Sequence, residues 1–383
     1  MKRKALYTRE DTAKLLLAGR DWNFHDVDTQ EHLHTLHPYP AKFIPQIPRK
    51  AILKWTRRGD LVYDPFCGCG TTLLEASLLG RPAIGTDNNA VAILVSKAKV
   101  ARLTQSSLRE LTKFAEHFRL PATNGKLKMG ELHLNKNIGY WFSPEVLNRL
   151  SALRSLISKT DEPLRTLLMA VFSAIIVKVS YQDSDTRYAK VSRNIAPSDV
   201  DNAFQRKLCN VIKILPQVLV PGRAKAKVVQ ADARKVPFIK TRSVSLIVTS
   251  PPYLNAYDYH KYHRQRIHWI NGSVAFARDL EIGSHDEFTK PHATPDQYFV
   301  DMQECFDEWQ RVLKRGGRCL VLIGDAIVSK CPVSVADRYV DLAKEVGLRL
   351  EDRWIRELQA TKRSFNVWNS RISHEHVLLF RKP

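Results

Sequence analysis

The fold is decided by the stretch Leu61-Val62-Tyr63-Asp64-Pro65-Phe66-Cys67-Gly68-Cys69-Gly70-Thr71-Thr72, in which a short apolar strand runs into a glycine-containing turn. A helix is predicted next at 72–79, then a strand at 83–85 and a second helix at 90–100. This strand–helix alternation predicts an α/β fold with a doubly wound, mostly parallel sheet. The two glycines allow the backbone to turn tightly and to approach a ligand closely.

The rest of the chain divides into a helical segment and a second set of strands. The longest apolar stretch, Leu167 to Val177, is too short for a bilayer span and predicts a buried helix. A later helix at 298–313 is expected to stop at Gly316-Gly317. Further strands are predicted at 228–229, 245–248, 319–323, 348–355 and 376–381, with a helix at 335–346. We therefore expect one sheet, formed by residues 1–102 and 226–383, with a helical insertion at 103–225.

Composition points to the class of partner. The 383 residues include 60 Lys and Arg against 39 Asp and Glu, a formal net charge of +21, which suits a polyanion. The hydrophobic fraction of 44% argues against disorder. No apolar signal core follows the basic residues Met1 to Lys4, so we expect a cytoplasmic protein that does not enter a membrane. The six cysteines offer one close pair, Cys67 and Cys69, which predicts reduced thiols and no metal site.

Two carboxylates flank the first turn. Asp64 begins it, and Asp87 ends the second strand, the usual place for a carboxylate that binds ribose hydroxyls. The turn lacks both the third glycine of a dinucleotide site and the lysine of a P-loop. An anion at Asp64 would repel a pyrophosphate but would suit a ligand with a cationic amino group.

A second turn, Ser250-Pro251-Pro252-Tyr253, follows the strand at 245–248 and should reach the same edge of the sheet. The two prolines fix the backbone and remove two amide donors, which leaves carbonyl acceptors. Ser250 Oγ and the Pro251 carbonyl beside the ring of Tyr253 suit an exocyclic amino group on a flat heterocycle. Taken alone, the motif favours a plain turn; together with the Asp64 turn in the same sheet it favours a ligand site.

Together the two turns resemble those of S-adenosylmethionine-dependent DNA amino-methyltransferases, typified by the cytosine-N4 enzymes. Residues 64–72 match the D-P-F-x-G-x-G-T-T cofactor loop, and residues 250–253 match the S-P-P-Y catalytic loop. Three weaker matches are Gly85-Thr86-Asp87-Asn88, Ala231-Asp232-Ala233 and His37 to Pro48. The resemblance covers the sheet-forming half of the chain and implies a Rossmann-like methyltransferase fold.

The resemblance implies a role for each matched residue. Asp64 would bind the methionine amino group, Asp87 the ribose and Asp232 the adenine amine, while Ser250 and Pro251 would hold the target amine. Tyr253 would stack on a base that has swung out of the duplex. The implied catalytic residues are Ser250, Pro251, Pro252 and Tyr253. The implied cofactor-binding residues are Lys42, Phe43, Asp64, Pro65, Phe66, Gly68, Gly70, Thr71, Thr72, Asp87, Asn88, Asp232 and Ala233.

Two segments mix basic and aromatic residues in a way that suits phosphates and bases. One lies at 181–193 in the insertion and the other at 257–266, after the catalytic loop. A solvated face with inward-packed tyrosines is the alternative for each. Their candidate nucleic-acid-binding residues are Arg187, Lys190, Arg193, Tyr257, Lys261, Arg264 and Arg266. Helical spacing of His260, His263 and His268 without an acidic partner pattern does not predict a metal site.

The resemblance implies site-specific methyl transfer to an exocyclic amine in double-stranded DNA. Serine at the start of the catalytic loop favours cytosine N4 over adenine N6. An RNA amino-methyltransferase and a non-catalytic nucleic-acid-binding subunit are further alternatives, and the missing third glycine opposes a nicotinamide dehydrogenase. The resemblance also leaves open a cognate restriction endonuclease as a partner. All of these methyltransferase readings require the turns at Gly68 and Pro251 to meet at one edge of the sheet.

Overall fold

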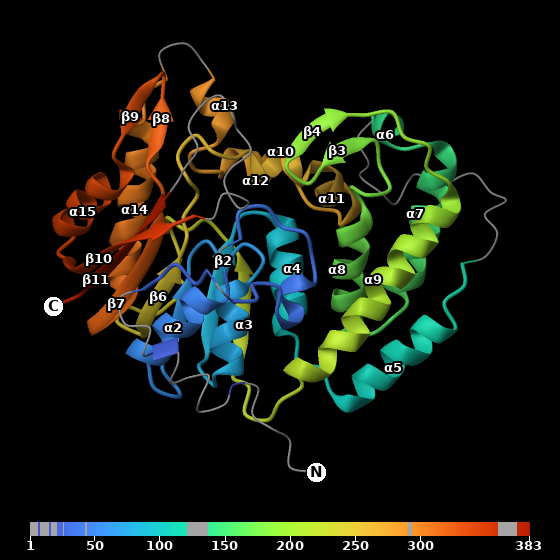
Figure 1. The fold of residues 1–383 in the computed structure, drawn as a ribbon, viewed down its shortest axis with the longest axis horizontal. Coiled ribbons are helices and arrows are strands. Elements are labelled where there is room, and N and C mark those ends of the chain that lie inside the picture. Colours follow the sequence, from blue (N-terminus) through green and yellow to red (C-terminus); the bar gives the residue numbers. More distant parts are fainter. Residues whose placement is uncertain are drawn as a thin grey trace.

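A seven-stranded sheet with the order β10-β11-β7-β6-β1-β2-β5 forms the centre of the molecule (Figure 1). The structure, a computed structural model, describes residues 7, 15–16, 21–25, 27–42, 44–120, 137–289, 293–358 and 374–383. Neighbouring strands from β7 to β5 are parallel, whereas β11 is antiparallel to both β7 and β10. The strands are β1 (Val62–Asp64), β2 (Ala83–Asp87), β5 (Ala226–Gln230), β6 (Val244–Thr249), β7 (Leu313–Ile323), β10 (Arg349–Glu357) and β11 (His374–Arg381). The predicted doubly wound, mostly parallel sheet is confirmed.

Helices cover both faces of this sheet. Val62 packs in a cluster with α2 (Gln46–Trp55) and α3 (Thr71–Leu78), whereas Tyr63 packs in a cluster with α14 (Asp296–Val312) and α15 (Val335–Glu345). Successive side chains on a strand point to opposite faces, so neighbouring residues of β1 serve two different cores. Such two-sided burial explains why the central strands are mostly apolar.

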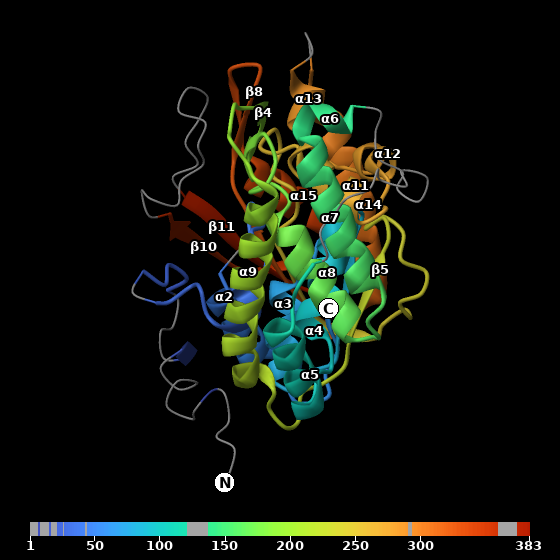
Figure 2. The same cartoon turned by 90° about the vertical axis from the view of Figure 1, so that its right-hand side faces the viewer.

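The segment between α4 (Ala90–Val100) and β5 forms a helical layer at one side of the sheet (Figures 1 and 2). It contains α5 (Gln105–Glu116), α6 (Ile138–Trp141), α7 (Pro144–Ser158), α8 (Leu164–Ile175), β3 (Gln182–Ser184), β4 (Arg187–Lys190) and α9 (Pro197–Val218). The apolar stretch at 167–177 is confirmed as a buried helix, α8, which contacts α4. The antiparallel hairpin β3–β4 was not predicted, because its strands are too short to show alternation. None of the described helices is both long and apolar enough to cross a bilayer.

The two ends of this segment lie close together. At its exit, the carbonyl of Lys99 accepts a hydrogen bond from Arg223 Nη2 at 3.3 Å. At its return, the Ala83 amide donates to the Lys225 carbonyl at 3.1 Å, beside the pairing of β2 with β5. The chain therefore leaves the sheet and rejoins it at adjacent points.

One predicted boundary is wrong. Helix α14 ends at Val312 and β7 begins at once, so Gly316 and Gly317 lie inside a strand instead of ending a helix. Leu313 leaves the helix at φ −65° and ψ 138°, and the glycines exchange backbone hydrogen bonds with Lys382 at 2.8 and 2.9 Å. Pairing with the end of the chain thus overrides the local glycine signal.

Short elements cover the carboxyl ends of the parallel strands. They are α10 (Tyr259–Tyr262), α11 (Arg264–Trp269), α12 (Val274–Asp279), α13 (His285–Phe288), β8 (Ala326–Val328) and β9 (Cys331–Val333). The short helix η1 (His32–Thr35) instead contacts α9. Figure 1 shows α10, α12 and the hairpin β3–β4 together above the sheet.

Candidate active site

The turn between β1 and α3 requires glycine at its end. Gly70 has φ +78° and precedes the first residue of α3. A Cβ atom there would lie 2.7 Å from Ser96 Oγ and 3.0 Å from Ser96 Cα. Ser96 Oγ also donates to the Gly68 carbonyl at 2.7 Å, which holds the turn against α4. The amides at the start of α3 therefore lie at the carboxyl edge of the sheet, where an anionic group can bind.

Asp64 connects this turn with the catalytic loop. Its Oδ1 accepts a hydrogen bond from Thr249 Oγ1 at 2.8 Å and another from the Phe66 amide at 3.2 Å. Its Oδ2 is buried and has no hydrogen-bond partner among the described residues. Burial raises the pKa of Asp64 to about 7, although the hydrogen bonds from Thr249 and Phe66 oppose the shift. A buried carboxylate with one unpaired oxygen fits a ligand that brings a cationic donor.

The catalytic loop is held from two sides. Tyr298 donates to the Pro252 carbonyl at 3.0 Å, and Tyr339 lies 2.7 Å from the Tyr298 hydroxyl. On the other side, the Tyr253 hydroxyl donates to Glu375 Oε1 at 2.7 Å. The loop is therefore fixed by α14, α15 and β11, none of which belongs to a recognised motif.

One pocket joins the two turns. The space between its lining residues is about 830 Å³, a volume that includes open solvent. The predicted residues that line it are Lys42, Pro65, Phe66, Gly68, Thr71, Asp87, Asn88, Asp232, Ala233, Ser250 and Pro252. The predicted residues outside its lining are Asp64, Gly70, Thr72, Pro251 and Tyr253, and Phe43 lies outside the described residues. The turns at Gly68 and at Ser250-Pro251 thus meet at one edge of the sheet, as the sequence requires.

Two carboxylates line the pocket at the ends of the neighbouring strands β2 and β5, where the Ala231 amide donates to the Asp87 carbonyl at 3.0 Å. Asp87 accepts hydrogen bonds from the Gly68 and Asn89 amides, both at 2.9 Å. Burial raises the pKa of Asp87 to about 6 in spite of these hydrogen bonds. Asp232 is paired with Arg234 at 2.8 Å, and Arg234 also reaches Asp301 at 2.7 Å. A ligand amine at Asp232 would therefore share this carboxylate with an arginine.

Sequence reasoning missed several residues that line the pocket. Tyr39 and Tyr259 stack with ring centroids 6.4 Å apart, and both line it. Glu281 lines it too, and accepts hydrogen bonds from His260 Nδ1 and from the Tyr259 amide, both at 2.6 Å. Tyr39 lies inside the recognised segment 37–48, so that motif carried a usable signal, whereas nothing in the sequence marks Glu281.

The segment before α2 is fixed to α3 by one fully buried carboxylate. Glu75 accepts hydrogen bonds from Arg49 Nε and His34 Nε2, both at 2.8 Å, and from the Tyr7 hydroxyl at 3.0 Å. Burial opposes ionisation, but the charge of Arg49 and the hydrogen bonds from His34 and Arg49 lower the pKa of Glu75 to about 2. Lys42 donates to the His34 carbonyl at 2.9 Å, so this network also places Lys42 at the pocket.

The two candidate nucleic-acid-binding segments lie side by side. Gln182 Nε2 donates to the Tyr262 carbonyl at 3.3 Å, and Arg264 lies over the Tyr188 ring at 5.8 Å. Arg187 and Lys190 are exposed, and Lys190 lies 4.0 Å from the centre of the Tyr140 ring. The remaining candidates are partly covered: Arg193, Tyr257, Lys261 and Arg264.

The structure contradicts the prediction for Arg266. This side chain is fully buried, where it donates to the Ser173 carbonyl at 3.0 Å and pairs with Asp185. It therefore joins α8 and the hairpin to α11 instead of facing DNA. The charge of Lys261 is partly neutralised within the protein as well, since this side chain forms ion pairs with Asp258 and Asp286.

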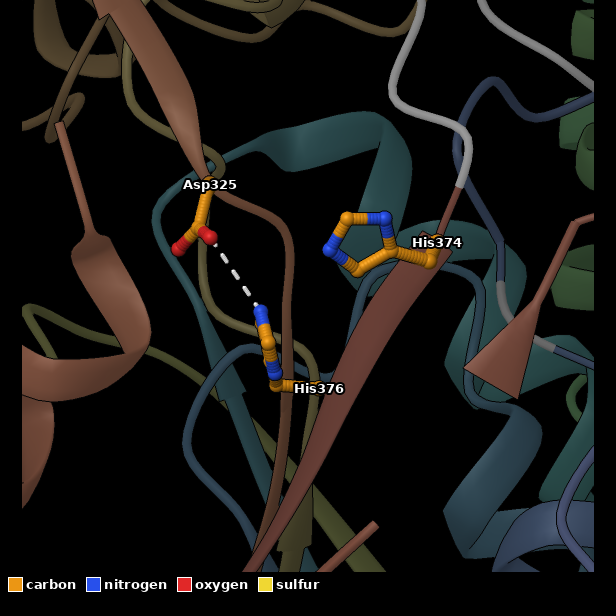
Figure 3. Close-up of side chains that lie close together, drawn as sticks. All are labelled: Asp325, His374 and His376. Atoms are coloured by element: carbon orange, nitrogen blue, oxygen red, sulfur yellow. Dashed lines mark hydrogen bonds and ion pairs between the residues drawn. The ribbon is translucent and has the colours of Figure 1, made fainter. Parts of the chain in front are cut away.

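A histidine cluster lies at the start of β11. The ligand atoms of Asp325, His374 and His376 all lie within 4.8 Å of one another (Figure 3). His376 Nε2 is 3.2 Å from Asp325 Oδ2, and Arg353 Nη2 is 3.3 Å from His376 Nδ1. Since arginine only donates, Nδ1 accepts and Nε2 carries the proton that it donates to Asp325. In that tautomer Nε2 has no lone pair for a metal ion, so this arrangement acts as a support between β7, β10 and β11.

Comparisons with known proteins agree with this architecture. The family model for DNA methylases of the N6/N4 type matches residues 3–98 and 244–383, and thus passes over the helical layer. The type II methyltransferase M.MvaI of Kocuria varians is 26% identical over 271 residues, which are 65% of this chain and 60% of that protein. The type II methyltransferase M.MjaII of Methanocaldococcus jannaschii is 20% identical over 387 residues, and the match covers 77% of this chain and 72% of that protein.

The chain spans 60% of M.MvaI and 56% of M.BsoBI, a type II methyltransferase of Geobacillus stearothermophilus. A solved TehB-like SAM-dependent methyltransferase from Corynebacterium glutamicum covers 88% of this chain and 87% of its own, with 12% identity and a TM-score of 0.33. The order and directions of the strands, not that likeness, define the fold here. The family match confirms the predicted family, and the chain belongs to the DNA methylase family of N4/N6 amino-methyltransferases.

Proposed function

We propose that this protein transfers a methyl group from S-adenosylmethionine to the N4 amine of cytosine in double-stranded DNA. One observation carries the proposal: a single pocket is lined by Gly68 of the cofactor turn and by Ser250 of the catalytic loop. Membership of the DNA methylase family supports the DNA substrate. Serine at position 250 supports cytosine rather than adenine as the base. A DNA substrate is consistent with the expected action in the cytoplasm.

The pocket residues fit the parts of S-adenosylmethionine. Asp87 offers carboxylate oxygens to the ribose hydroxyls, and Asp232 offers its carboxylate to the adenine amine. The unpaired Oδ2 of Asp64 would receive the methionine amino group when that buried oxygen is uncovered. The cofactor supplies an electrophilic methyl group on a sulfonium centre.

The catalytic loop would hold and activate the target amine. The lone pair of an exocyclic amine is delocalised into the base, and acceptors at its hydrogens favour the tetrahedral geometry needed for attack. The Pro252 carbonyl is already bound by Tyr298, so we assign the amine to Ser250 Oγ and the Pro251 carbonyl. Tyr253 would stack on the extruded base, which costs a few kcal/mol to remove from the duplex.

The joined surface of the hairpin β3–β4 and α10–α11 is the proposed DNA contact. Its exposed cations, Arg187 and Lys190, belong to β4, which lies above the sheet (Figure 1). The net charge of +21 supports binding to phosphates, with an affinity that falls steeply as salt rises.

The test is transfer from methyl-labelled S-adenosylmethionine to duplex DNA, followed by mass spectrometry of the nucleosides. N4-methylcytosine is the expected product. N6-methyladenine would overturn the choice of base, transfer only to RNA would overturn the choice of nucleic acid, and cofactor binding without transfer would overturn catalysis. Ser250→Ala and Tyr253→Ala should lose turnover yet bind the cofactor, whereas Ser158→Ala on the exposed face of α7 should match the wild type.

A further inference from the structure

We propose that Glu375, supported by Arg356, is a positioning residue that sets the orientation of Tyr253 in the catalytic loop. This inference rests on the proposed function and adds the residue through which β11 acts on the loop. The Tyr253 hydroxyl donates to Glu375 Oε1 at 2.7 Å. Glu375 Oε2 pairs with Arg356 Nη1, and Arg356 Nε donates to the Trp22 carbonyl at 3.1 Å.

The topology of the sheet explains why a residue of the last strand reaches the catalytic loop. Strand β11 runs antiparallel to β7, so its first residues lie at the edge where the parallel strands end. His376 pairs with Ile323, the last residue of β7, and Glu375 lies directly opposite Arg356 on β10. Glu375 is therefore placed by strand pairing on both sides, not by a loop.

The neighbours of Glu375 support this placement. Because side chains alternate along a strand, His374 and His376 share one face and Glu375 faces the other way. His376 is held by Asp325 on its own face (Figure 3). Arg353 Nη2 also lies 3.3 Å from His376 Nδ1. Side chains on both faces of β11 therefore hold its first residues in place, and on one face Glu375 contacts Tyr253.

The ion pair is mostly buried, with side-chain exposures of 8% for Arg356 and 13% for Glu375. Without the Glu375 acceptor, the Tyr253 hydroxyl would donate to water instead, and its ring would move with it. Burial and the charge of Glu375 raise the pKa of Tyr253 well above its usual value, so the phenol stays protonated and keeps donating. Misplacement of a reacting group by about 1 Å lowers rates by about 100-fold. Glu375 is not among the residues that line the cofactor pocket.

The experiment compares kcat, the Kd for S-adenosylmethionine and the unfolding midpoint in Glu375→Ala, Glu375→Gln and Tyr253→Phe. Glu375→Ala should lower kcat by about 10- to 100-fold and leave the cofactor Kd within about twofold. Glu375→Gln keeps an acceptor oxygen for Tyr253 and should recover most of the rate. In the Tyr253→Phe background, Glu375→Ala should add less than about a twofold loss, because the bond is already gone. The control is Glu351→Ala, which removes the pairing of Arg318 with another carboxylate of the same sheet.

An unchanged kcat in Glu375→Ala, or a full additional loss in the Tyr253→Phe background, would overturn the inference. A readout independent of methyl transfer is nitration of Tyr253 by tetranitromethane, located by peptide mass spectrometry. Nitration should increase in Glu375→Ala and stay at the wild-type level in Glu351→Ala. If the wild type transfers no methyl group, the proposed function fails, while the nitration result still decides whether Glu375 positions Tyr253.

Discussion

Replacing Gly70 by alanine tests whether the cofactor turn depends on close backbone packing. Gly70 has φ +78°, a conformation that costs an alanine about 1–2 kcal/mol. The added Cβ would also lie 2.7 Å from Ser96 Oγ and 3.0 Å from Ser96 Cα. Because Cα belongs to the backbone, rotation of the serine side chain does not relieve the second contact. Overpacking of this kind costs about 1–3 kcal/mol. We expect Gly70→Ala to lower the free energy of unfolding by about 2–5 kcal/mol.

Gly347 supplies the matched control. It has φ +80°, but nothing lies within 4 Å of its added Cβ, so Gly347→Ala should cost only the conformational part, about 1–2 kcal/mol. Urea unfolding followed by tryptophan fluorescence measures both values, and calorimetry measures cofactor affinity. Only Gly70→Ala should weaken S-adenosylmethionine binding. Equal losses of stability in the two variants, or an unchanged cofactor affinity in Gly70→Ala, would refute the reasoning.

Three further predictions concern charged groups. Above pH 7, Asp64→Asn should raise the free energy of unfolding by up to about 4 kcal/mol. The pKa of Asp64 is about 7 in the folded protein against the usual 3.8, so the wild type loses stability as this carboxyl ionises in the folded state. The same variant should bind S-adenosylmethionine more weakly in calorimetry. Glu75→Gln should lower the free energy of unfolding, measured in urea, by about 3–5 kcal/mol. The wild type loses stability as the pH falls from 4.5 toward the pKa of about 2 that Glu75 has in the folded protein, and the variant should lack this part of the pH dependence. Arg187→Ala should reduce the salt slope of duplex binding by about 1 in fluorescence anisotropy without changing the unfolding midpoint, whereas Arg266→Ala should lower that midpoint.

The site could be predicted where local sequence determines backbone geometry. A glycine turn after a strand and a proline turn after another strand must both lie at the carboxyl edge when the strands are parallel. Asp87 could be found for the same reason, since it ends the next strand. The motif identified Tyr253 but not its partner Glu375. The contact depends on the order and direction of the strands, which neither the residues around Tyr253 nor those around Glu375 specify.

Residues whose roles depend on long-range packing could not be placed from the sequence. Arg266 lies in a basic, aromatic stretch that is typical of a nucleic-acid contact, yet its partners Ser173 and Asp185 come from the distant insertion. Gly316 and Gly317 carry a helix-ending signal, yet backbone pairing with Lys382 places them in a strand. In each case the deciding partner is more than sixty residues away.

The joined ends of the helical layer have an evolutionary consequence. Lys99 and Arg223 are hydrogen-bonded to each other where the chain leaves the sheet and returns to it. The segment between them is therefore an insertion whose two ends are held together. Its length and the hairpin β3–β4 can change while the paired strands of the sheet stay the same, provided that the apolar side of α8 still packs against α4. If this hairpin contacts DNA as proposed, exchange of the segment would alter that contact and leave the proposed methyl-transfer site in place.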